Sequence, residues 1–413
     1  MRLFLFFVIT SMTMSAQRYS GNNLGGYSGV YGIQENPASF VNKRPKWDVN
    51  IIGTGLYAYS EYGYIANQSV LSMSGGRNVY NASDSIPPDF NSETGALFYA
   101  NNYSDPIIGL MFNQSLHLPS FCFKVKNFSF GLFSNARIGA DAMNTPAFFN
   151  YYNLKELTDF KPYTIGPTTV NAMAWGEIGV NVGYAHELEN ENILSVGVNA
   201  KYLMGFEAVY LNNKSDYNFI RERDTFRAND ANLTVGFATG ASRTNNDYHF
   251  GVNGTGLGLD IGAEYMIPNE DEESNSVHYM KFGAAVRDLG AITFNKNTER
   301  HDFAVNDINF EVLKGISYNR NHNYDIVKRL SAAVYSGDST KSLVSREITM
   351  YTPTSLTAYW DYNFRPDFFV NVYATRRLKT LQTQLSAPNV FMLSARYEKR
   401  WFEAGASVSL TED

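Results

Sequence analysis

Hydrophobic and polar residues alternate along most of the chain beyond residue 46. From Ala174 to His186, one face reads Ala, Gly, Ile, Val, Val, Tyr, while the positions between them include Glu and Asn. The alternation resumes from Leu194 to Met204, after a polar stretch. A period of two is the pattern of a β-strand with one apolar face. Similar runs lie at 47–60, 116–141, 257–287, 356–374 and 391–410. The sequence therefore predicts an all-β fold of antiparallel hairpins.

The lengths of these runs and of their connections favour a membrane barrel. The runs exceed the ~5–6 residues of an ordinary strand and fit the ~9–11 residues of a tilted membrane strand. Short turns near residues 127, 190, 366 and 400 alternate with long connections at 143–171, 209–230, 297–353 and 378–388. We therefore expect a transmembrane antiparallel β-barrel of about 12–14 strands, within the range that outer-membrane barrels use. A soluble all-β sandwich is the alternative, because its strands also alternate.

Charged residues fall on the more polar face of several hairpins. A turn at Lys399-Arg400 would place Arg396 directly opposite Glu403, and the turn near residue 190 would bring Glu177 close to Lys201. Because a charge at the bilayer midplane costs about 2–4 kcal/mol, we expect this face to line the lumen. It would carry either structural ion pairs that fill the lumen or a polar lining for a solute path. The lumen-facing candidates are Glu177, Lys201, Asp260, Glu264, Lys281, Arg287, Arg396 and Glu403.

Composition agrees with this prediction and excludes other classes. Aromatic residues make up 15% of the chain and charged residues only 18%. The net charge of −6 gives no basic footprint for nucleic acid. The single cysteine, Cys122, excludes an internal disulfide framework. Beyond the N-terminus, no apolar run approaches the ~20 residues of a spanning helix.

The first residues have the pattern of an export signal. A charged start at Arg2 precedes an apolar stretch, Leu3 to Ile9, and then Ser15-Ala16-Gln17. This pattern predicts a signal peptide at residues 1–16, cleaved after Ala16. With the predicted barrel, it places the protein in the cell outer membrane.

Several stretches resemble known outer-membrane families. Asn36-Pro37-Ala38, after a glycine-rich start, resembles the opening of long-chain fatty-acid transporter (FadL-like) barrels, and residues 194–203 and 256–294 resemble strands of that superfamily. Residues 351–402 resemble an uncharacterised barrel family of Bacteroidota, related to the PorV and PorP/SprF barrels of type IX secretion. The resemblance implies that residues 17–46 form a hatch in the lumen of a barrel over 47–413. Its hatch candidates are Asn36, Pro37 and Ala38.

Two features depart from that resemblance. Residues 297–353 form a long polar insertion, in which Ile326, Leu330 and Val334 predict a helix over Tyr324–Tyr335 that packs on the barrel. The chain also stops at Asp413 without the aromatic-ended strand that such barrels usually carry. We therefore expect missing last strands, or a further periplasmic domain, beyond this point.

The sequence contains few candidates for a catalytic or metal-binding site. Its six histidines are scattered without metal-ligand spacing, and no nucleophile motif accompanies them. The acidic run at 270–273 is typical of a solvated turn. We expect no cofactor, no metal and no enzymatic activity, with outer-membrane lipid as a partner. Passive uptake or binding of a small hydrophobic molecule ranks slightly first. The alternative is a scaffold that binds envelope proteins in type IX secretion, surface attachment or gliding motility.

Overall fold

The computed structural model describes residues 21–60, 63–66, 79–81, 96–100, 108–145, 159–223, 225–241, 247–269, 277–309, 323–399 and 402–412. The predicted signal peptide at 1–16 and the acidic run at 270–273 lie outside these residues. Most of the described chain forms antiparallel strands, which confirms the predicted all-β fold.

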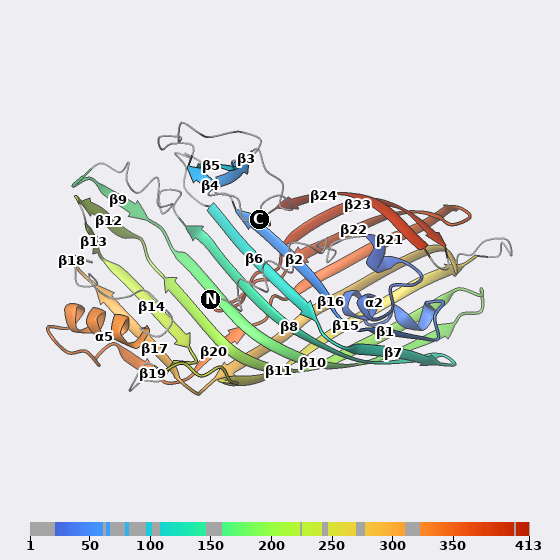
Figure 1. Cartoon of the computed structure of the whole chain (residues 1–413), viewed down its shortest axis with the longest axis horizontal. Coiled ribbons are helices and arrows are strands. Elements are labelled where there is room, and N and C mark those ends of the chain that lie inside the picture. The colour runs from blue at the N-terminus through green and yellow to red at the C-terminus, as the bar shows by residue number, and fades with distance from the viewer. Residues whose placement is uncertain are drawn as a thin grey trace.

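One large sheet dominates the molecule (Figure 1). Several of its runs are interrupted, and the pieces of each run continue along the same neighbours. In ladder order the long runs are β1/β2 (Trp47–Asn50, Gly53–Ser60), β6/β7 (Ile108–His117, Ser120–Val125), β8 (Phe128–Thr145), β10 (Thr168–Glu187), β11 (Ile193–Asn213), β15 (Gly254–Pro268), β16 (His278–Phe294), β20/β21 (Ile348–Tyr351, Ser355–Arg365), β22 (Phe368–Arg377), β23 (Asn389–Lys399) and β24 (Phe402–Glu412). Among the described strands, the ladder ends at β1/β2 on one side and at β24 on the other.

The end of the sheet with the long connections carries further elements. Three shorter strands complete the large sheet there: β14 (Ala231–Ala238), β17 (Thr298–Val305) and β19 (Leu343–Ser345). Helix α5 (Asn323–Val334) packs its buried Tyr324, Val327 and Leu330 against Phe237 and Phe303 of β14 and β17. Two small sheets lie apart, formed by β9 (Pro162–Ile165), β12 (Tyr217–Glu222), β13 (Thr225–Asn229) and β18 (Ile308–Asn309), and by β3 (Gly63–Ala66), β4 (Val79–Asn81) and β5 (Ala96–Ala100).

Burial in the long strands is inverted relative to a soluble protein. Along β11, Val196 and Val198 are 50% and 41% exposed, whereas Ser195 and Asn199 are completely buried. The same alternation holds on β10, where Ile178 and Val180 are exposed and Asn181 is buried. The apolar face therefore points outward and the polar face inward.

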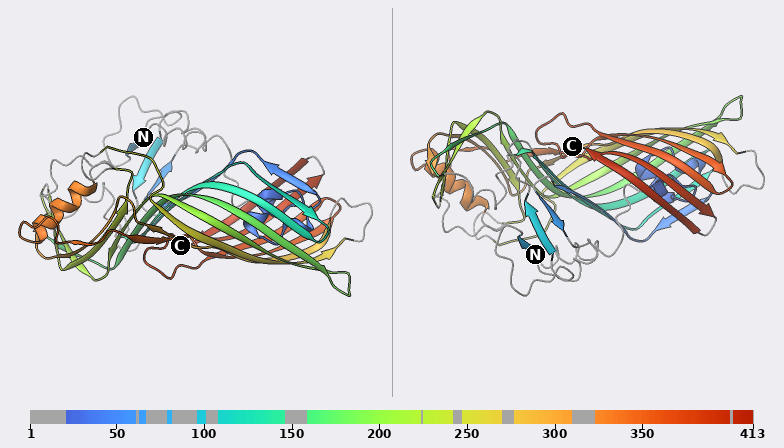
Figure 2. Two further views of the ribbon diagram at one scale, coloured as in Figure 1. Left: turned by 90° about the horizontal axis from the view of Figure 1, so that it is seen from below. Right: turned by 90° about the horizontal axis from the view of Figure 1, so that it is seen from above.

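The N-terminal segment, residues 21–46, occupies the interior. It contains η1 (Gly21–Leu24), α2 (Gly29–Glu35) and η2 (Phe40–Asn42). Strands of the large sheet pass on several sides of α2 (Figure 2). The segment bonds to wall residues as far apart in the ladder as Asn181 on β10, Arg287 on β16 and Glu398 on β23. The sheet therefore wraps around this segment.

Three expectations need correction. Among the described residues the large sheet has 17 strands. β14 continues β15 along β11, β17 continues β16 and β19 continues β20, so counting each interrupted run once gives 11 described runs where about 12–14 were expected. The strands are longer than predicted, because β10 and β11 span 20 and 21 residues and extend into the supposed loops. The insertion at 297–353 is not simply a polar loop, since it contains β17, β18, β19 and β20. Its predicted helix over Tyr324–Tyr335 is confirmed as α5.

Candidate functional site

The Asn36-Pro37-Ala38 motif lies against a row of small residues on the inner face of the sheet. Gly183, Gly197 and Gly262 are paired side by side across β10, β11 and β15, and their row continues through Ser129 on β8 and Ala285 on β16. A Cβ added at Gly197 would fall 2.3 Å from the carbonyl carbon of Pro37. At Gly197 the backbone of the motif therefore approaches the sheet too closely for any side chain.

Polar side chains of the wall fix the motif in place. Asn36 accepts a bond from the Ala38 amide and donates to the carbonyl of Ala263, at 2.9 Å, and to the hydroxyl of Tyr359, at 3.1 Å. The Asn181 amide donates to the carbonyl of Pro37 at 3.0 Å. A buried carbonyl without a partner costs about 1–3 kcal/mol. These amides therefore make the close approach stable.

The rest of the segment is anchored on both sides of this motif. Asn199 donates to the carbonyl of Ile33 at 2.9 Å. The Glu35 carboxylate pairs with Arg287 on β16 and accepts a bond from Tyr373 on β22, at 2.9 Å. Lys281 donates to the carbonyl of Leu24 at 2.7 Å. The segment is therefore bonded to the wall along its whole described length inside the sheet.

One group of buried charges lies beyond α2, toward the long connections. This Asp288 cluster consists of Arg137, Glu177, Lys201, Asp260 and Asp288, all at most 7% exposed. Lys201 bonds Asp260 at 2.7 Å and Asp288 at 2.8 Å, while Arg137 bonds Asp288 at 2.8 Å and approaches Glu177 at 3.4 Å. Glu177 and Lys201 are thus close, as predicted, and Arg137 and Asp288 link them.

A β-bulge explains how Asp288 enters this cluster. Leu259 pairs with Leu289 and Ile261 with Val286, so Asp260 faces two residues, Arg287 and Asp288, and Asp288 has a φ of 55°. A bulge turns two successive residues to the same side. Regular alternation instead places Asp288 on the outer face.

A second group of buried charges lies at the end with the short turns. This Asp361 cluster consists of the buried Glu264, His278, Lys281, Asp361, Arg396 and Glu398 and the partly exposed Glu403. Arg396 bonds Asp361 at 2.9 Å and Glu398 at 3.1 Å, and Lys281 lies 3.7 Å from Asp361 and 4.0 Å from Glu264. Glu398 also accepts bonds from the Gly26 amide, so this cluster too holds the N-terminal segment.

The predicted register of the last hairpin was wrong by two residues. Lys399 pairs with Phe402, which places Gly405 opposite Arg396 and Glu398 opposite Glu403. A shift of two residues keeps every side chain on its face. Arg396 and Glu403 therefore remain diagonal neighbours, 3.8 Å apart. All eight lumen-facing candidates point inward, and Glu403 is the most exposed of them.

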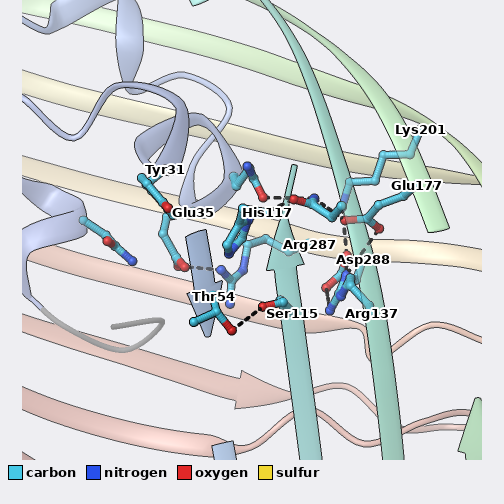
Figure 3. A pocket seen from close by; sticks show the side chains of 13 residues that line it. Tyr31, Glu35, Thr54, Ser115, His117, Arg137, Glu177, Lys201, Arg287 and Asp288 are labelled. Atoms are coloured by element: carbon cyan, nitrogen blue, oxygen red, sulfur yellow. Dashed lines mark hydrogen bonds and ion pairs between the residues drawn. The ribbon is translucent and has the colours of Figure 1, made fainter. Parts of the chain in front are cut away.

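A small cavity lies between α2 and the wall (Figure 3). Its volume is about 120 Å³, and Tyr31, Glu35, His117, Arg137 and Arg287 are among its lining residues. This is room for several water molecules. The lining carries charges of both signs, and the cavity therefore suits water or a small polar solute.

Residues that matter here were missed by the sequence reasoning for identifiable reasons. Glu35 lies in a helix and Asp288 in a bulge, whereas Arg137 and Asp361 lie beside charged residues of the adjacent strands, Glu177 on β10 and Lys281 on β16. Period-two counting could have found Arg137 and Asp361, because both lie on the inward face of a recognised hairpin. No group of three potential metal-binding side chains occurs among the described residues.

Outside the long strands, Asp338 closes the turn after α5. It accepts bonds from the amides of Thr340 and Lys341 and from the Thr340 hydroxyl. The Thr340 amide is the main cause that lowers the pKa of Asp338 below its ordinary value.

A family model covers residues 37–413, starting within the Asn36-Pro37-Ala38 motif. The chain belongs to DUF5723, a family of unknown function. No curated protein and no solved structure matches it. Within the described part of the chain, the helices are too short or too polar to cross a bilayer.

Proposed function

We propose that this DUF5723 protein is a non-enzymatic β-barrel of the cell outer membrane, closed inside by its N-terminal segment. The observation that carries the proposal is the inverted burial of the long strands. Valine, isoleucine, leucine and aromatic side chains cover the outer face, and ionised groups fill the interior. In water the exposed apolar face would be a large aggregation hazard, whereas in a bilayer it is the stable arrangement. The export pattern at residues 1–16 supports the same location.

Within the membrane, we infer a scaffold role. The interior is crossed by ion pairs and by the bonded N-terminal segment, and the cavity described beside α2 is small and lined by charges. Strands of 20 and 21 residues exceed the ~9–11 that cross a bilayer, so about half of β10 and β11 would extend outside it. That part carries α5 and a second sheet, and offers a surface for envelope partners. The resemblance to barrels of type IX secretion agrees with this role.

Uptake of a small hydrophobic molecule is the second candidate. It is favoured by a buried apolar cluster farther along the interior, which includes Trp175, Leu203, Phe294 and Met350. A hydrophobic molecule would have to pass the N-terminal segment, which requires that segment to move.

Fractionation and gel mobility test the common part of both proposals. We expect the protein in isolated outer membranes, with a compact band that migrates more slowly after boiling. A soluble periplasmic protein of unchanged mobility would remove both roles. Cross-linking in intact cells then separates them: recovery of a specific envelope protein supports the scaffold, and its consistent absence argues against it.

A further inference from the structure

The connection between β22 and β23, residues 378–388, runs over the surface only in its first part, where Leu378 and Leu381 are 38% and 44% exposed. Gln384, Leu385 and Ser386 are 4%, 1% and 1% exposed. The sequence had placed this stretch among the long outer connections, where polar residues meet water. The burial of residues 384–388 shows that the second part of the connection folds into the interior instead.

This connection reaches the wall opposite its own strands. Asn171 on β10 donates to the carbonyl of Gln384 at 3.3 Å, and Asn113 on β6 donates to that of Ser386 at 3.5 Å. Strands β6 and β10 lie several positions away from β22 in the ladder. The connection therefore crosses the interior.

It crosses at a different level from the N-terminal segment. On β10, Asn171 holds the connection and Asn181, ten residues farther along the strand, holds Pro37. At about 3.3 Å per residue, the two levels are separated by roughly 33 Å of strand. The Asp288 cluster and the apolar cluster lie between them. The connection and the segment are thus two separate closures of one interior.

A single carboxylate organises the crossing. Asp141 on β8 is 1% exposed and accepts bonds from Lys379 at 2.8 Å, from the Ser386 amide at 2.8 Å and from Asn171 at 3.2 Å. Two of these donors belong to the connection itself. A buried carboxylate needs such donors, because leaving one uncompensated is costly.

The apolar contact of the connection is made by one residue. Leu385 joins the buried apolar cluster that includes Met173, Trp175 and Met350. A short backbone bridge also holds it: the Leu385 amide donates to the carbonyl of Tyr351, and the Tyr351 amide donates to that of Thr383. Apart from that bridge and the bond from the Leu378 amide to the carbonyl of Thr354, the bonds named above that hold the connection to the wall all involve a side chain.

We propose that residues 378–388 form a lid that closes the interior from the side of the long connections, with Asp141 as its latch. When the latch is released, the lid swings away from β8 and β10 and withdraws Leu385 from the apolar cluster. The interior below then becomes accessible while the N-terminal segment stays seated.

A cysteine reporter on the lid tests this proposal. In a Cys122→Ala background, Ala387→Cys places a thiol at a small side chain that is 6% exposed. The rate of labelling by a polar maleimide is measured on the full-length protein in detergent. Asp141→Asn removes the ion pair and puts an amide donor opposite the Ser386 amide. Lys379→Gln is the milder variant, which leaves the other two bonds to Asp141.

If Asp141 holds the lid closed, Asp141→Asn should speed labelling at least about tenfold, and Lys379→Gln should speed it by a smaller factor. The matched control is Asp307→Asn, which removes an ion pair with Arg227 outside the lid and should label like the parent. Equal labelling of all variants, each with a compact band before boiling, would overturn the proposal. If Asp141→Asn does not fold, Lys379→Gln decides. Because band mobility is recorded for each variant, failure of the lid is distinguishable from failure of the barrel.

Discussion

The glycine row beneath the Asn36-Pro37-Ala38 motif gives the sharpest test of how the interior is closed. Gly197→Ala adds one methyl group, whose carbon would lie 2.3 Å from the carbonyl carbon and oxygen of Pro37 and 2.5 Å from the Ala38 amide nitrogen. These are backbone atoms and cannot rotate away. Either the segment leaves its seat or the wall deforms.

A lower limit to the cost of unseating the segment follows from three of the bonds that hold it. These are the bonds from Asn181 to Pro37, from Asn199 to Ile33 and from Asn36 to Ala263. At about 0.5–1.5 kcal/mol each, they contribute roughly 1.5–4.5 kcal/mol, and the ion pair of Glu35 with Arg287 adds to this cost. Overpacking typically costs about 1–3 kcal/mol, so a deformation with the segment still seated is the cheaper response. We therefore expect the seated state to lose about 1–3 kcal/mol, a factor of roughly 5 to 150 in its population relative to the unseated state.

Limited proteolysis measures the population of the unseated state. Trypsin cleavage after Lys43, which is 3% exposed, should accelerate by about the same factor in Gly197→Ala. The control is Gly258→Ala on the neighbouring strand, where the added carbon would meet its nearest atom at an ordinary 3.4 Å. Equal protection of Lys43 in both variants, with both folded, would refute the close approach of the motif.

Three further perturbations test other parts of the account. Arg287→Ala leaves the buried Glu35 without its ion-pair partner and should lower the free energy of unfolding by about 3–5 kcal/mol. Urea titration in detergent measures this loss. The control is Arg300→Ala, at an exposed pair with Asp302, which should cost under about 1 kcal/mol. Val198→Arg puts a charge on the apolar outer face and should lower the free energy of unfolding in lipid vesicles by about 2–4 kcal/mol. The control Glu191→Arg, in an exposed turn, should leave it almost unchanged. Equal losses in the two variants would contradict a lipid-facing β11. Because hydrogen bonds lower the pKa of folded Asp338 below its ordinary 3.8, their stabilisation is present above that value and is lost as the pH falls through the folded-state pKa. Hydrogen exchange at the end of α5 should therefore quicken below about pH 4 in the parent and be insensitive to pH, once corrected for intrinsic exchange, in Asp338→Ala.

Period-two alternation was enough to predict the strands and the face to which each side chain points. Ser195 and Val196, or Arg396 and Tyr397, could be assigned to opposite faces because the backbone pleat leaves no choice. The register of the last hairpin was less certain, since a shift of two residues preserves both faces.

The closures of the interior depended on contacts that no local pattern encodes. Asn36-Pro37-Ala38 was recognised through a resemblance, but its glycine row lies on three strands far from the motif in sequence. The inward course of residues 378–388 depends on Asp141, more than 230 residues earlier in the chain. Asp288 was missed because a bulge reverses the face that alternation assigns.

The central claim is that the apolar outer face of the long strands lies in lipid. Spin labels at Val196→Cys and Val198→Cys, each in a Cys122→Ala background, and at Asn190→Cys in the β10–β11 turn would be compared in lipid vesicles. Collision rates with oxygen, which concentrates in the bilayer, and with a water-soluble nickel complex would be measured at each site. The account predicts high oxygen and low nickel collision rates at residues 196 and 198, and the reverse at residue 190. Nickel collisions at residues 196 and 198 as frequent as at residue 190 would place this face in water and contradict the membrane barrel.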